Sequence, residues 1–323
     1  MPQALSNLAV GSKVKFGKYQ VNTEDAQPIV WTIVAKNHSC TPAYPDNAIT
    51  LHATEILDLR CFDAKELNNG NPNRNAGNNR YSVSNIDQWL NKDAVGGAWY
   101  SAAHSADQSP NSSSVLYANT PYASHPGFLN AFTDAEKAAI LTTTIRVVKA
   151  STDGGSYEDI SRKVFLPSKT EVGLSNENSI AEGASWTNFT RITYVTQQCF
   201  DNTLSSEKPS SKNTAWHWWT RTPLYTSANN PWIVGSNGTT MARQACYGQF
   251  GVRPALNLSS TLSVSDSTDA DGCYTFVWTN PTDYTFTLNG TQYTNVARIN
   301  YVSGNTTREI KKLVVNGSTV WQA

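Results

Sequence analysis

Residues 215–256 read AWHWWTRTPLYTSANNPWIVGSNGTTMARQACYGQFGVRPAL, and the interpretation of the whole chain depends on this segment. It holds four of the ten tryptophans, at positions 216, 218, 219 and 232, and it contains no aspartate or glutamate. An aromatic segment without acidic side chains is either the core of a fold or a surface built for contact.

Strand alternation divides these tryptophans. In a strand over residues 216–222, Trp216 and Trp218 share one face, while His217 and Trp219 share the other with Arg221. Because both faces cannot be equally exposed, we expect Trp218 and Trp219 to belong to the structural core.

The residues around a predicted hairpin are the candidates for ligand contact. Asn237-Gly238 is a strong signal for a tight turn between strands at 231–235 and 239–247. Aromatic rings can stack on the apolar face of a sugar while amides bond its hydroxyls, and the same groups dominate protein interfaces. Ordinary packing around long loops is the alternative. The residues expected to contact a ligand are His217, Tyr225, Asn229, Trp232, Arg243 and Tyr247.

Composition excludes several functional classes. Lys+Arg and Asp+Glu balance at 25 each among 323 residues, so net charge does not favour nucleic-acid binding. The N-terminal residues lack a secretory signal pattern, and no apolar run approaches a membrane span, so we expect no export signal and no membrane insertion. Five scattered cysteines without a CxxC pair fit reduced, buried thiols in a protein made in a cytosol.

The rest of the chain predicts short strands, short helices and long polar loops. The expected elements are a hairpin over 10–35, a helix over 84–91 capped by Ser84, a helix from a capping box at Thr133 and Glu136 through Leu141, and a strand over 164–167. Residues 51–67 carry mixed signals that allow a short helix, and residues 68–79 have almost no side chain suited to a core. We expect a first domain at 1–258, a Ser/Asp/Thr linker at 259–272, and a small all-β module at 273–323 with hairpins at 285–290 and 313–321.

No pattern for catalysis is found. The chain lacks phosphate-binding, dinucleotide-binding, zinc-protease and nucleophile-elbow motifs, and its five histidines are not spaced as metal ligands. We therefore expect no catalytic residues, no metal and no cofactor. Among the acids, Glu171 alone is a candidate for a buried structural role, because it follows a proline-ended strand.

A set of motifs, in order over about residues 10–260, resembles a domain of unknown function common in Gram-positive gut bacteria and their phages. The motifs are VKFGKY at 14–19, IVW at 29–31, IDQWLN at 86–91, FTDAE at 132–136, VFLPS at 164–168, WWTRTP at 218–223 and GVRPAL at 251–256. That domain is similar to the C-type-lectin-like fold of formylglycine-generating enzymes and of retroelement variable proteins. The resemblance implies an α+β, C-type-lectin-like fold with short helices and long loops, followed by a small all-β domain. It also implies a buried structural role for Arg253 and for one or both of Trp218 and Trp219, and a ligand-facing role for the residues between them.

The resemblance implies a virion protein rather than an enzyme. Formylglycine-generating enzymes hold copper with a cysteine pair near the closing motif, where only Cys246 is present here, and the histidine cluster of related iron enzymes is absent. The C-terminal module resembles short β tails of phage minor structural proteins. We expect a tail- or surface-displayed adhesin that binds a host-surface glycan or protein, assembles with other virion proteins and forms a homo-oligomer. The alternatives are a capsid decoration, collar or tail-assembly protein without a ligand, and a formylglycine-generating-type metal oxidase.

Overall fold

The largest sheet grows from the predicted N-terminal hairpin. In the computed structural model, which describes residues 1–22, 25–117 and 124–278 and beyond them only strands, β2 (Lys13–Tyr19) pairs antiparallel with β3 (Gln27–Lys36). β4 (Ala48–Ala53) pairs with the other edge of β3, and all six of its residues are buried. The hairpin is therefore confirmed. The next strand, β4, overlaps the start of residues 51–67, where the sequence allowed a short helix.

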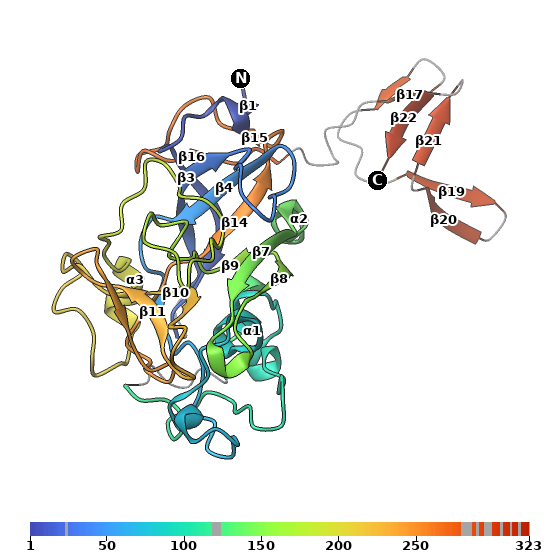
Figure 1. The fold of residues 1–323 in the computed structure, drawn as a ribbon. Coiled ribbons are helices and arrows are strands. Elements are labelled where there is room, and N and C mark those ends of the chain that lie inside the picture. Colours follow the sequence, from blue (N-terminus) through green and yellow to red (C-terminus); the bar gives the residue numbers. More distant parts are fainter. Residues whose placement is uncertain are drawn as a thin grey trace. The chain divides into compact units, whose positions relative to one another are not determined.

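β14 (Ala255–Ser259) joins distant parts of the chain within this sheet. It pairs with β4, with β6 (Ile140–Leu141) and with β9 (Val164–Phe165). β16 (Tyr274–Thr275) adds a parallel edge strand on β2, which completes the seven-stranded sheet. Figure 1 shows β3, β4 and β14 side by side in the upper part of the region formed by residues 1–276, which we call the first unit.

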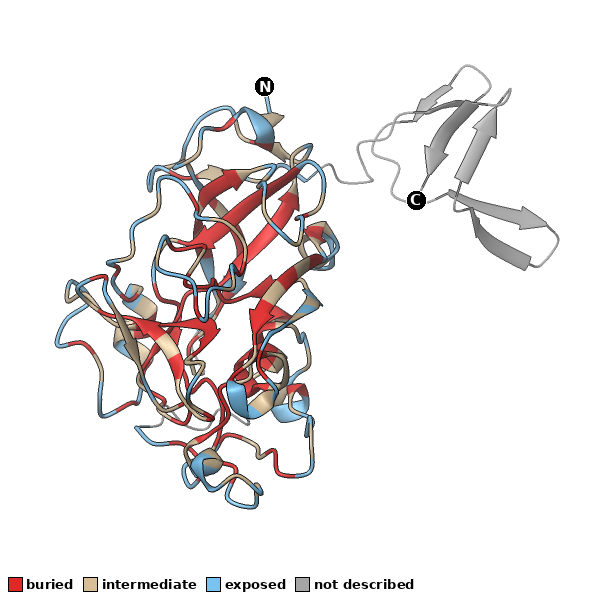
Figure 2. Cartoon of the chain, viewed as in Figure 1, coloured by how far each residue is buried: buried red, intermediate tan, exposed pale blue. Residues whose placement is uncertain are grey.

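A second, five-stranded sheet contains the tryptophan-rich segment. Its order is β12 (Thr240–Ala242), β11 (Pro231–Val234), β10 (Trp218–Pro223), β13 (Gly251–Val252) and β5 (Asp58–Leu59). Every residue of β10 is buried, so both faces of this strand are covered (Figure 2). The expected hairpin at Asn237-Gly238 is confirmed by the pairing of β11 with β12, although β12 ends at Ala242.

Short elements complete the first unit. The remaining strand pairs are β1 (Gln3–Ala4) with β15 (Ser263–Val264), and β7 (Thr143–Val148) with β8 (Tyr157–Arg162). The α-helices are α1 (Asn85–Leu90), α2 (Asp134–Ala139) and α3 (Gln197–Asn202). Single 3-10 turns lie at Leu5–Asn7, Pro72–Ala76, Tyr81–Val83, Gly96–Trp99, Phe128–Ala131 and Ser151–Asp153.

The expected α+β, C-type-lectin-like class is wrong, because the described chain is mainly β. Ser84 caps α1 and the Thr133–Glu136 capping box starts α2, as the sequence predicts, but each helix has only six residues. A cap specifies where a helix begins and not how far it runs. Ile140 and Leu141 leave α2 to pair with Leu258 and Asn257 of β14, so sheet pairing ends the helix.

The first unit runs from Met1 to Phe276, and the second from Val277 to Ala323. The expected boundary at 258 and the expected linker at 259–272 therefore differ from the structure. Val264 and Cys273 are buried, and the ring of Phe276 lies 5.1 Å from that of Phe16. Lys15 Nζ also forms ion pairs with Asp269 (2.7 Å) and Asp271 (2.5 Å), so a polar composition does not make this stretch a linker.

The described parts of the second unit are three antiparallel strand pairs. They are β17 (Phe286–Leu288) with β18 (Thr291–Tyr293), β19 (Ile299–Ser303) with β20 (Thr306–Ile310), and β21 (Lys312–Val315) with β22 (Ser318–Gln322). The expected hairpins at 285–290 and 313–321 fall on the first and third pairs, and their Asn-Gly turns lie outside the described residues.

Polar side chains take part in the core of the first unit. Arg221 and Glu171 are both fully buried and form a two-pronged ion pair, with Nη1–Oε2 at 2.6 Å and Nη2–Oε1 at 3.0 Å. This confirms the structural role expected for Glu171. Asn78 and Asn79 are buried as well, and Asn79 Nδ2 donates to three backbone carbonyls of the 224–230 loop, so part of the 68–79 segment enters the core after all.

Candidate functional site

The three residues expected to be structural lie in the core. Trp218 and Trp219 have no exposed surface, and their indole N–H groups donate to the carbonyls of Arg191 (3.0 Å) and Arg60 (2.8 Å). Arg253 is 2% exposed and donates to three backbone carbonyls at 2.8–3.0 Å. Burial lowers the pKa of Arg253, but the three carbonyl acceptors favour its protonated form.

A row of aromatic rings lies beside this core, and we call it the aromatic surface. It consists of Trp216, His217, Phe250, Tyr247 and Tyr117, whose successive ring centroids are 5.4, 6.0, 6.2 and 5.3 Å apart. Phe250 is buried and supports the row, the other members are partly exposed, and 43% of Tyr117 is accessible. Such a row presents the edges and faces of its exposed rings to a partner, while the buried Phe250 ring beneath them is held in place by packing.

Backbone contacts hold the outer end of the aromatic surface in place. The amide of Leu116 donates to the carbonyl of Cys246 (2.9 Å), and that of Gly248 donates back to Leu116 (2.6 Å). This bridge places Tyr117, from a loop far away in sequence, against Tyr247. Leu116 itself is 37% exposed and extends the apolar area.

Arg243 adds a positive charge next to the rings. It is exposed, and its charge acts on both His217 and Tyr247. Burial and the Arg243 charge lower the pKa of His217, so this imidazole is neutral at neutral pH. His217 Nδ1 accepts a hydrogen bond from the Ser236 amide at 3.3 Å, which leaves the proton on Nε2. The structure thus brings together three of the six expected contact residues.

Tyr225 and Trp232 belong to a different cluster, centred on Glu177. The Tyr225 amide donates to Glu177 Oε1 and the Trp232 indole N–H to Oε2, both at 2.8 Å. Lys169 Nζ donates to the same Oε2 at 2.9 Å and lies 4.1 Å from the centroid of the Trp232 ring. Trp232 therefore connects β11 with the segment that contains Lys169 and Glu177, and its ring is only partly exposed.

Asn229 stabilises the loop between β10 and β11. Its side-chain Oδ1 accepts from Ser227 Oγ at 2.8 Å, and its carbonyl accepts from the Ala245 amide at 2.9 Å. These are local turn contacts, so Asn229 is placed with the loop and shows no contact with the aromatic surface among the described residues.

Three members of the aromatic surface, Trp216, Phe250 and Tyr117, were not among the contact residues expected from the sequence. Phe250 precedes the closing Gly251-Val252-Arg253 motif and could have been recognised as apolar support for it. Tyr117 carries no comparable signal, because it lies in a long polar loop and reaches the site only through the bridge to residue 247.

The cysteines of the described part of the chain are free thiols. No group of three His, Cys, Asp or Glu side chains there is arranged to hold a metal ion. Cys61 and Cys246 are buried free thiols, and burial raises the pKa of Cys246 to about 11, which favours the protonated thiol over the metal-binding thiolate.

Residues 47–260 match a family described only as a domain of unknown function, DUF6273. The chain belongs to this family. The matched region holds the aromatic surface and the Glu177 cluster, so both are part of the family domain. No curated protein and no solved structure matches the chain.

Proposed function

We propose that this protein is a structural component of a phage or prophage particle, and that its first unit binds a host-surface glycan or protein through the aromatic surface. Binding is reversible and involves no covalent step. The protein acts as a homo-oligomer, together with other virion proteins.

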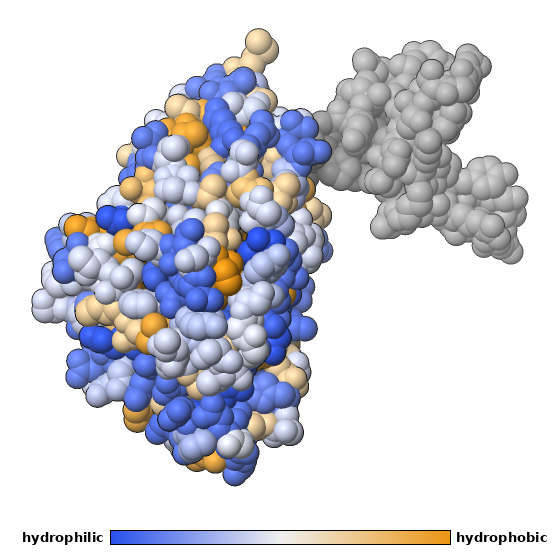
Figure 3. All heavy atoms as spheres, in the orientation of Figure 1, coloured by the Kyte–Doolittle hydropathy of each residue, from blue (hydrophilic) through white to orange (hydrophobic). Residues whose placement is uncertain are grey.

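The observation that carries the binding role is the row of partly exposed rings with Arg243 beside it. Trp, Tyr and Arg side chains supply much of the energy of protein interfaces, and rings also stack on sugars. Figure 3 shows a first unit whose visible face is largely polar, with small groups of apolar residues. No helix among the described residues is long and apolar enough to cross a membrane.

The virion role is supported by the sequence resemblance to a domain found in phages and to the β tails of phage minor structural proteins.

Binding of the purified, fluorescently labelled protein to host cells tests the proposal. Tyr247→Ala and Arg243→Ala should each reduce bound protein about fivefold or more, the loss of about 1 kcal/mol of contact energy. Tyr194→Ala is the control, because Tyr194 is 43% exposed and lies outside the aromatic surface.

Unchanged cell binding by folded Tyr247→Ala and Arg243→Ala proteins would contradict the adhesin role. If the same variants instead yield particles that fail to assemble, the aromatic surface is an interface between virion subunits. The ring-and-guanidinium composition of this surface favours that second candidate function as well.

A further inference from the structure

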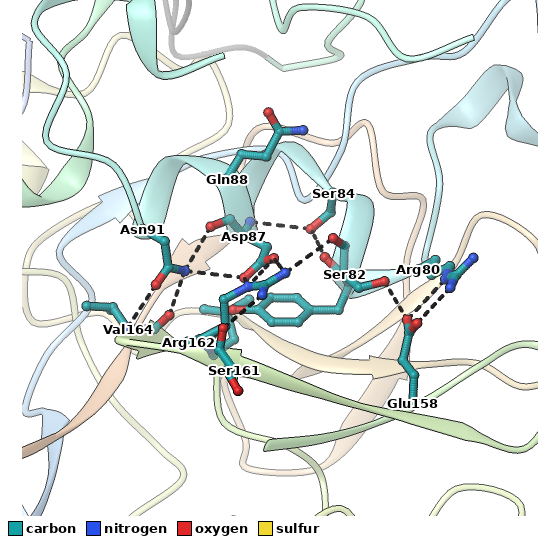
Figure 4. Close-up of polar contacts among 12 residues, drawn as sticks. Arg80, Ser82, Ser84, Asp87, Gln88, Asn91, Glu158, Ser161, Arg162 and Val164 are labelled. Atoms are coloured by element: carbon teal, nitrogen blue, oxygen red, sulfur yellow. Dashed lines mark hydrogen bonds and ion pairs between the residues drawn. The ribbon is translucent and has the colours of Figure 1, made fainter. Parts of the chain in front are cut away.

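A polar hollow of about 440 Å³ lies between α1 and the end of β8, away from the residues of the aromatic surface. Its walls come from three separate stretches, residues 82–92, 101–103 and 161–163, with Thr142 at one side. Figure 4 shows Asp87 and Arg162 facing each other here, with Arg80 and Glu158 paired nearby.

The guanidinium of Arg162 is held in one orientation. Its Nε lies 2.9 and 2.7 Å from the two carboxylate oxygens of Asp87, which is 2% exposed. Nη1 donates to the carbonyl of Ser161 at 2.9 Å, and the Arg162 side chain remains 24% exposed. A charged donor fixed in this way loses little conformational entropy when it binds a further acceptor.

Among the side chains that line the hollow, cations outnumber carboxylates, and the buried Asp107 accepts hydrogen bonds from the lining residues Gln88 and Ala103. Lys92, Arg162 and Lys163 line it against a single carboxylate, that of Asp87. The neighbouring Glu158 is neutralised by Arg80, whose Nε and Nη2 donate to it at 3.0 and 2.6 Å. Lys163 Nζ donates to the Lys137 carbonyl at 2.7 Å, which orients the ammonium group without cancelling its charge.

The remaining lining consists mainly of neutral hydrogen-bonding groups. They are the hydroxyl groups of Ser82, Ser101, Thr142 and Ser161 and the side-chain amide of Gln88. The Asn91 amide also lines the hollow, but it is engaged by Asp87 and by the backbone of residues 163 and 164. Hydroxyl and amide groups can donate to and accept from the hydroxyls of a sugar, and no aromatic ring lines this hollow.

We propose that the polar hollow binds a sugar that carries an anionic oxygen group, either a carboxylate or a phosphate. Arg162 and Lys92 contact the anionic group, because a guanidinium matches its oxygens and an ammonium adds charge. The serine hydroxyls and the Gln88 amide contact the sugar hydroxyls. This site shares no residue with the aromatic surface and does not depend on the proposed virion role.

Calorimetric titration of the full chain with glucuronate, glucose 6-phosphate, glucose and inorganic phosphate tests this site. We expect glucuronate or glucose 6-phosphate to bind at least about tenfold more tightly than glucose, and the tighter of the two identifies the anionic group. Affinity should fall as salt is added, because the contacts with exposed cations are screened. Equal binding of glucose would overturn the proposal, as would inorganic phosphate binding as tightly as glucose 6-phosphate.

Lys92→Glu should weaken binding of the preferred anionic sugar about fivefold or more, since a favourable charge becomes a repulsive one. Lys92 is exposed, so the variant should fold normally. Arg162→Lys keeps the charge opposite Asp87 and should also weaken binding through loss of the planar fork. Lys18→Glu, an exposed charge reversal on β2, is the matched control. Unchanged affinity in both Lys92→Glu and Arg162→Lys would reject the site, whatever the outcome of the cell-binding experiment.

Discussion

Arg221 and Glu171 illustrate how charged residues can lie in the centre of this domain. Neither side chain has exposed surface, and Tyr44 donates its hydroxyl proton to the same carboxylate. Glu171→Gln should lower the free energy of unfolding by about 3–5 kcal/mol, because it leaves a buried guanidinium without its counter-charge. Denaturant titration measures this cost.

The control for that prediction is Glu158→Gln, which removes the acid of the partly exposed pair with Arg80. A solvent-accessible ion pair contributes about 1 kcal/mol or less, so this variant should be much milder. Similar decreases in the free energy of unfolding in the two variants would show that the buried ion pair contributes no more to stability than the exposed one.

Glu182 links the stability of the same region to pH. It is fully buried, accepts from the Val148 amide at 2.9 Å and receives the Thr222 hydroxyl. Desolvation raises its pKa from 4.5 to about 7. The protonated carboxyl therefore contributes stability at low pH, and this contribution is lost as pH rises through about 7.

Comparison with Glu182→Gln isolates this effect from the histidines, which both proteins share. The stability of the variant relative to wild type should increase by about 2 kcal/mol between pH 5 and pH 8. Denaturant titrations at the two pH values provide the measurement. A pH-independent difference would mean that Glu182 does not titrate in this range.

At the scale of elements, β2 depends on a glycine in the left-handed region. Gly17 has a φ of +66°, and the register with β3 shifts between Lys15 and Lys18. A Cβ at this position would lie 2.1 Å from Cε1 of Phe132. Gly17→Ala should therefore destabilise the protein by about 2 kcal/mol or more, through both backbone strain and a clash.

Gly272→Ala provides the matched control, because Gly272 also has a positive φ, +72°, but nothing lies within 4 Å of its added Cβ. Gly272→Ala should lower the free energy of unfolding by only about 1 kcal/mol, because it introduces backbone strain without a clash. Thermal unfolding of both variants separates the two contributions. Equal losses would show that Phe132 moves aside without cost.

At the scale of the whole molecule, the position of the unit boundary leads to a truncation test. A fragment of residues 1–276 keeps β15 and β16 and should unfold cooperatively, because it contains the whole of the first unit. A fragment of residues 1–258 loses the buried Val264 and Cys273 and uncovers Phe16, and should be less stable by about 3 kcal/mol or more. Denaturant titration compares the two, and equal stability would place the boundary at 258.

The sequence by itself determined features that depend on neighbouring residues. The β2–β3 hairpin, the Ser84 cap, the Thr133–Glu136 capping box and the Asn237-Gly238 turn all follow from local geometry and short-range hydrogen bonds. Trp218 and Trp219 are both buried as expected, but alternation alone did not select them, because they lie on opposite faces of a strand whose two faces are both covered.

Only the tertiary structure decided how long the helices are, where the first unit ends and which aromatic residues form a surface. The helix α2 ends before Ile140 because Ile140 pairs with β14. Residues 263–276 belong to the first unit because β15 pairs with β1 and β16 pairs with β2. Trp232 was expected to face a partner, yet Glu177, 55 positions away in sequence, receives its N–H. The physical reason is common to all of these cases: burial and pairing depend on partners that local sequence does not reveal.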